Sequence, residues 1–164
     1  MTLRNVAKSS VWSVDRIVTM RKRKYLNQNC PVAQSLGVLG GQWTLLIARN
    51  LIRGINRFDG IQKNLNISRN LLAQRLKQME IDGLVNKITP SGFKRSTYIP
   101  TEKCYDLVNI LLSLSAWSEK WMPNSEVPKI RAAHPTTGKT LGLALVPINT
   151  IEKISPETLK IKFN

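Results

Sequence analysis

Between Pro31 and Val85, apolar residues recur three and four positions apart in four consecutive segments. This spacing places side chains on one face of an α-helix and predicts four amphipathic helices. Pro31 suits the first turn of the first helix, and Gly40, Gly54 and Gly83 suit the ends of the first, second and fourth. The apolar positions are, in chain order, Val32, Leu36 and Leu39; Trp43, Leu46, Ile47 and Leu51; Phe58, Ile61 and Leu65; and Leu72, Leu76 and Met79.

The fourth segment, residues 67–85, differs from the others in its polar positions. Ser68 is placed to cap the N-terminus of its helix. Opposite the leucines the helix carries amides and cations, and no carboxylate occurs before Glu80. Arg75 falls within the apolar arc, so its aliphatic stem is expected to pack while its guanidinium reaches outward. Such a helix is suited to an anionic partner.

The periodicity changes after the fourth segment. Residues 84–89 and 96–100 are short stretches rich in β-branched residues, and a proline and a glycine lie between them. This arrangement predicts a β-hairpin with a basic tip at Lys94 and Arg95.

A long helix is expected next, beginning at about Thr101 as its N-cap and ending before Pro123. From residue 124 the periodicity weakens, although residues 141–148 are a candidate strand. The apolar stripe of the long helix consists of Leu107, Leu111, Leu114, Trp117 and Trp121.

This order of elements predicts a winged helix-turn-helix: a mainly α, α+β fold with a small β-hairpin wing and a long C-terminal helix. We expect a basic N-terminal extension over residues 1–29, in which a basic run is either a solvated terminus or an arm for phosphates. The winged domain is expected over residues 30–128, and a tail of uncertain structure over 129–164. Met20 is a second candidate for the start of translation.

Charge narrows the class of partner. The chain has 25 Lys and Arg against 10 Asp and Glu, a net charge of +15, and between Arg16 and Thr101 its only carboxylates are Asp59, Glu80 and Asp82. Such a balance favours association with nucleic acid, anionic lipid or an acidic protein. Two cysteines, no signal peptide and no apolar stretch of transmembrane length favour a cytoplasmic protein that is not membrane-bound.

The candidate DNA-binding residues follow from groove chemistry. The major groove of DNA admits an α-helix, in which Asn and Gln pair with adenine, and Arg and Lys pair with guanine. The hairpin would reach phosphates or the minor groove. We expect Ser68, Arg69, Asn70, Gln74, Arg75 and Lys77 to act from the fourth helix, beside Ala73, and Lys94 and Arg95 to act from the wing.

Residues 30–121 resemble the HxlR family of bacterial winged-helix transcription regulators, which are related to the MarR-like group. The resemblance is carried by Cys30-Pro31, Gly40-Gly41-Gln42-Trp43-Thr44, Arg57-Phe58, Ile67-Ser68, Leu72-Ala73-Gln74-Arg75-Leu76 and Asp82-Gly83-Leu84-Val85. It implies that the helix opening at Ser68 is the recognition helix. It also implies a homodimer held by the first helix and the Leu107–Trp121 helix. The wing turn departs from the Pro-Pro-Arg run that the family often has.

The resemblance also suggests a thiol sensor. In similar regulators a cysteine at the Cys-Pro position responds to oxidants, and a helix N-terminus favours the thiolate. Cys30 is therefore the candidate redox sensor and Cys104 a candidate disulfide partner; the alternative is that both are small buried apolar residues. The tail resembles a zinc-ribbon tail in outline and keeps His134, Gly138 and Ser155-Pro156. It has no cysteine, so we expect no metal, no cofactor and an ordinary surface position for His134.

The sequence thus predicts a transcription regulator, expected to be a repressor, that reads an inverted-repeat operator in double-stranded DNA as a homodimer. The alternative is a basic RNA-binding or nucleoprotein-assembly module without operator specificity. Stacking aromatics are expected of such RNA readers, whereas the tryptophans here lie mostly in apolar stripes. We expect that the protein is not an enzyme and has no catalytic residue, because the chain has one histidine, few carboxylates and no phosphate-binding glycine loop.

Overall fold

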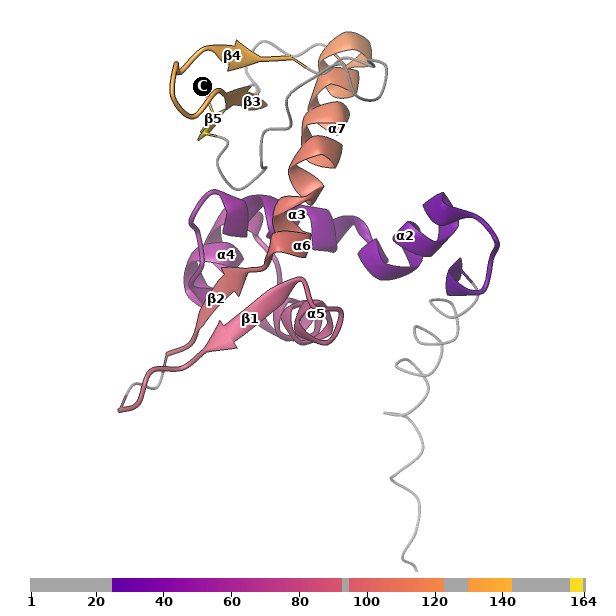
Figure 1. The fold of residues 1–164 in the computed structure, drawn as a ribbon. Helices are drawn as coiled ribbons and strands as arrows, with labels where there is room; N and C mark the ends of the chain where they lie inside the picture. Colours follow the sequence, from indigo (N-terminus) through magenta and orange to yellow (C-terminus); the bar gives the residue numbers. More distant parts are fainter. Residues whose placement is uncertain (1–24, 93–94, 123–129, 143–159, 164) are drawn as a thin grey trace, which may run out of the picture. The chain divides into compact units, whose positions relative to one another are not determined.

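The computed structural model describes residues 25–92, 95–122, 130–142 and 160–163. The chain forms two compact units, residues 1–44 and residues 45–164, and the boundary between them falls inside the second of the helices below. The elements in Figure 1 are α2 (Pro31–Leu39), α3 (Gln42–Ile52), α4 (Phe58–Leu65), α5 (Arg69–Ile81), β1 (Val85–Ile88), β2 (Thr97–Pro100), α6 (Glu102–Tyr105), α7 (Leu107–Trp121), β3 (Ile130–Ala133), β4 (Thr140–Leu141) and β5 (Lys160–Phe163).

In the first unit, α2 begins and ends where the sequence predicts. Pro31 lies in its first turn, and Cys30 is the N-cap residue without a side-chain capping bond. Gly40 ends the helix in the left-handed region at φ 42°, and its N–H donates to the Leu36 carbonyl at 2.8 Å. A glycine adopts this conformation without the steric cost that a Cβ atom adds.

The core of the second unit is built from the apolar stripes that the sequence predicts for α3, α4 and α5. Full burial of one large aliphatic side chain contributes about 1.5–3 kcal/mol, so these stripes dominate the stability of the unit. Phe58 and Leu65, expected to be buried, are only half-buried. The buried apolar residues are Ile47, Ala48, Leu51, Ile61, Ile67, Leu72, Leu76, Met79, Leu84, Val85, Tyr98, Cys104, Leu107, Val108, Ala132 and Ala133.

The predicted hairpin is confirmed. Strands β1 and β2 pair antiparallel, with Val85 opposite Pro100 and Ile88 opposite Thr97. The chain before α4 joins the same hairpin, because the Tyr98 N–H donates to the Asn56 carbonyl at 2.9 Å and Arg57 forms a β-bridge with Thr97. These backbone bonds hold the wing beside the N-terminus of α4.

The long helix predicted from Thr101 is divided into α6 and α7. Thr101 caps α6 as predicted, because its hydroxyl accepts from the Cys104 N–H at 3.4 Å. The interruption is the single residue Asp106, whose N–H is shared between the carbonyls of Glu102 and Cys104. Aspartate is a weak helix former, and a shared hydrogen bond tightens the turn, which explains the break.

Part of the tail forms a three-stranded antiparallel sheet with β3 in the centre, between β4 and β5. The Arg131 guanidinium donates to both carboxylate oxygens of Glu119 on α7, at 2.5 and 2.7 Å. His134, expected to be an ordinary surface residue, is partly exposed and closes the turn between β3 and β4. Its Nδ1 accepts from the N–H groups of Thr136 and Thr137 at 3.2 and 3.3 Å. The candidate strand at 141–148 lies outside the described residues from Leu143 onward, and so does Ser155-Pro156.

Among the described residues, none of the helices has both the length and the apolar character needed to cross a bilayer. The described His, Cys, Asp and Glu side chains nowhere come together in groups of three that could hold a metal ion.

Candidate nucleic-acid interface

Helix α5 presents the polar face that the sequence predicts. Ser68 is its N-cap residue, and its hydroxyl accepts from the Leu71 N–H at 3.4 Å. Arg75 is half-buried, as expected for a side chain whose stem packs beside the apolar stripe. The exposed residues of the predicted set on this helix are Ser68, Arg69, Asn70, Gln74 and Lys77.

Negative charge on α5 is confined to its C-terminal end. Glu80 is exposed in the last turn, and Asp82 follows as the C-cap residue, where its carboxylate accepts from the Gln78 amide at 3.1 Å. The first three turns of the helix therefore offer amide and cationic groups to an approaching polyanion without a carboxylate of their own.

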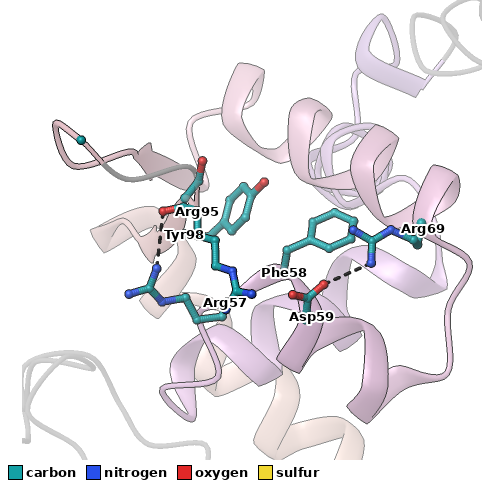
Figure 2. Close-up of a pocket in the computed structure, with 8 residues that line it drawn as sticks. Arg57, Phe58, Asp59, Arg69, Arg95 and Tyr98 are labelled. Carbon is teal, nitrogen blue, oxygen red and sulfur yellow. Dashed lines mark hydrogen bonds and ion pairs between the residues drawn. The ribbon is translucent and has the colours of Figure 1, made fainter.

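A groove separates the start of α4 and α5 from the wing, with a volume of about 870 Å³ (Figure 2). Three arginines and one carboxylate line it, so its net charge is positive. It exists because the backbone bonds described above hold β2 against the segment that leads into α4. The lining residues are Arg57, Phe58, Asp59, Arg69, Gly92, Arg95, Ser96 and Tyr98.

Arg69 is held on one side of this groove by α4. Its Nη1 donates to Asp59 Oδ1 at 3.1 Å and to Gln62 Oε1 at 3.2 Å. The guanidinium carbon lies over the ring of Phe58, 5.0 Å from the ring centroid. Both members of the ion pair stay 67% exposed, so the guanidinium is oriented yet open to a partner.

Arg57 lies on the opposite side, as Figure 2 shows. It is the N-cap residue of α4, and its side chain does not cap the helix. Within the described part of the chain its guanidinium makes one long hydrogen bond, from Nη1 to the Arg95 carbonyl at 3.5 Å. A guanidinium held only by a neutral acceptor can take an anion in the groove without leaving a carboxylate behind.

Tyr98 forms the inner wall of the groove. Its side chain is nearly buried, and this burial raises the pKa of the phenol, with a further contribution from the negative charge of Glu80. The phenol therefore remains protonated at neutral pH, with a hydroxyl that can donate a hydrogen bond.

Sequence reasoning missed part of this groove. The sequence patterns predict no site role for Arg57-Phe58, although it carries the family resemblance, and none for Asp59 or Tyr98. The available signal was that Asp59 is one of only three carboxylates between Arg16 and Thr101. On the wing, Arg95 is exposed, and Lys94 lies outside the described residues. Contact of all these residues with DNA remains a prediction.

The two cysteines differ in environment. Cys30 is exposed and Cys104 is buried, and both are free thiols. Burial raises the pKa of the Cys104 thiol from 9.0 to about 12. A thiol that is both covered and protonated is a poor nucleophile, so Cys104 is not a ready disulfide partner in this fold.

Known proteins are similar to this chain in sequence and in fold. Residues 38–126 match the HxlR-like helix-turn-helix family. Over 125 residues, covering 76% of this chain and 79% of the relative, the chain is 32% identical to the uncharacterized HTH-type transcriptional regulator Rv3095 of Mycobacterium tuberculosis. The solved structure of PA1607 is 26% identical and covers 77% of this chain and 89% of its own, with a TM-score of 0.67. The redox regulator HypR in its reduced form is 27% identical and covers 57% of this chain and 95% of its own, with a TM-score of 0.53.

These relatives are regulators of transcription rather than enzymes, and the solved structures share the winged-helix fold of this chain. The match to the family spans more than half of the chain, from the end of α2 to beyond α7. The chain therefore belongs to the HxlR-like helix-turn-helix family of winged-helix, DNA-binding transcription regulators.

Proposed function

We propose that this regulator is a homodimeric repressor that reads an inverted-repeat operator and blocks its promoter by occupying it. The observation that carries the proposal is the polar face of α5, free of carboxylates over three turns and flanked by the arginine-lined groove. In this arrangement α5 enters the major groove, where Asn70 and Gln74 read base edges. The wing and the groove hold the sugar-phosphate backbone.

The dimer is proposed to form through α2 and α7 of two copies. Each helix has an exposed apolar stripe: Val32 and Leu36 are 68% and 55% exposed on α2, while Leu114, Trp117 and Trp121 are 49%, 56% and 61% exposed on α7. Exposed aromatic and aliphatic side chains in contiguous stripes are typical of surfaces that associate. A second copy of the chain is the occupant we propose, because a two-fold dimer would place two α5 helices on an inverted repeat.

Selection from a random duplex library tests this function. We expect the full-length protein to enrich an inverted repeat whose half-sites lie about 34 Å apart, one turn of DNA. It should bind that duplex as a dimer, with a preference over scrambled duplex that survives at higher salt. Gln74→Ala should then relax the preference at one base position. If the library yields no common sequence, or if single-stranded RNA competes better than duplex, the regulator is instead a nonspecific nucleic-acid-binding module.

A thiol response through Cys30 is the second part of the proposal. Its thiol is exposed at the first turn of α2, within the proposed dimer interface, and HypR is a redox regulator. An adduct or an intermolecular disulfide at Cys30 would change the dimer geometry and release DNA. Diamide should abolish operator binding by the wild type and by Cys104→Ser, and leave Cys30→Ser bound. Equal loss in the Cys30→Ser variant would remove the sensor from the proposal.

A further inference from the structure

We propose that Asp59 is a specificity-determining residue that positions Arg69 to read one base pair, with guanine as the base favoured. This inference rests on the proposed function, because it concerns how the same interface discriminates between sequences. Its basis is the place of Asp59 in the groove. Among the described lining residues Asp59 is the one carboxylate, and the other charged residues are arginines.

A stability role does not explain this carboxylate. The ion pair between Asp59 and Arg69 is 67% exposed on both sides, and such pairs contribute little to folding. Asp59 also lies in the first turn of α4, where a negative charge interacts favourably with the helix dipole. That benefit does not need an arginine partner.

The geometry of Arg69 indicates what the carboxylate does. The hydrogen bonds to Asp59 and Gln62 both use Nη1, while Phe58 supports the guanidinium from below. Within the described part of the chain, these contacts leave Nη2 and Nε of Arg69 to donate to a further partner. A fork fixed in this way has little side-chain freedom left to lose when it meets two acceptors.

The two acceptors that match this fork on a base edge are O6 and N7 of guanine in the major groove. Arg69 is the first residue of α5, directly after the Ser68 cap, and residues at the N-terminal end of a recognition helix contact base edges. An arginine whose guanidinium is mobile can still bind a phosphate, whereas an arginine that reads a base needs a guanidinium held in one orientation. Asp59 should therefore strengthen operator binding while its charge weakens binding to phosphates in general.

These opposite effects are measurable with Asp59→Ala and a matched control, Glu102→Ala. Both residues are exposed acids in the first turn of a helix, so both substitutions remove one charge and one dipole interaction. Glu102 does not line the groove. Affinities of the full chain for the selected operator, its single-base variants and a scrambled duplex would be measured across a salt series, after thermal melting shows that each variant is folded.

With Asp59→Ala we expect roughly five- to tenfold weaker operator binding, which corresponds to the partial loss of one bidentate base contact. The preference for G·C at one position should become smaller. Binding to scrambled duplex should tighten roughly twofold, with a steeper salt dependence. Glu102→Ala should leave the base preference unchanged. In an Arg69→Gln background, Asp59→Ala should leave the base preference where Arg69→Gln already put it.

Two results would overturn the inference. One is a parallel gain of affinity for operator and scrambled duplex, which would make Asp59 a general charge only. The other is an Asp59→Ala effect on base preference that persists without Arg69. Failure of the wild type to select any operator would instead reject the proposed function, so the two failures are distinguishable.

Discussion

Truncation of Leu114 on α7 should weaken the proposed dimer more than it weakens the fold. The side chain is 49% exposed in the single chain, so about half of its transfer free energy is still available to an interface. Full burial of a leucine contributes about 1.5–3 kcal/mol, which leaves roughly 1 kcal/mol in each protomer. A two-fold interface contains the residue twice. Leu114→Ala should therefore cost about 2 kcal/mol, or roughly a 30-fold rise in the dimer dissociation constant.

Ile88 on β1 provides the matched control, because it is 50% exposed and lies on the wing rather than on the proposed dimer surface. Sedimentation equilibrium of wild type, Leu114→Ala and Ile88→Ala over a range of concentrations would give the three dissociation constants. Both variants should lower the free energy of unfolding of the monomer by a similar amount, roughly 1 kcal/mol, because about half of each side chain is buried in the fold. An equal shift for the two variants, or a wild type that stays monomeric, would refute the assignment of α7 to the interface.

Three further predictions concern the groove, the core and the thiols. Arg57→Gln should weaken binding to every duplex alike and reduce the slope of log affinity against log salt by about 1, measured by fluorescence anisotropy; an unchanged slope would exclude a phosphate contact. Leu72→Ala should lower the free energy of unfolding by about 2–5 kcal/mol in urea, since Leu72 is 0% exposed, and a loss below about 1 kcal/mol would contradict that burial. A disulfide reagent at pH 8 should modify Cys30 at once and Cys104 only in urea, because burial raises the pKa of Cys104 to about 12 and keeps it protonated; two fast thiols in the native protein would refute this.

The helices were predictable because their signals are local. Apolar residues three and four apart define α2 to α5 without reference to any distant part of the chain, and Ser68 and Gly40 mark ends through their own backbone and side-chain chemistry. The division of the last helix was not predictable in the same way. It depends on how the N–H of Asp106 is shared between two carbonyls, and apolar spacing carries no information about that choice.

The groove and the tail sheet depend on pairings between distant residues. The groove requires Tyr98 to bond Asn56 and Arg57 to pair with Thr97, contacts across about forty residues that no local pattern encodes. In the tail, Ala133 pairs with Lys160 across a long intervening segment. Short strands of this kind give weak sequence signals, because their stability comes from the partner rather than from their own residues.

Net charge and specificity act in opposite directions in this regulator. A chain of charge +15 attracts any duplex, and that attraction carries no sequence information. Additional arginines alone would raise affinity for all DNA and leave the discrimination between sequences unchanged. Discrimination requires that a cation be fixed in direction and that its contact with an arbitrary phosphate be discouraged. A carboxylate beside the cation meets both requirements, at the cost of some total affinity. In the proposed interface, Asp59 lies beside Arg69 and is placed to act in this way.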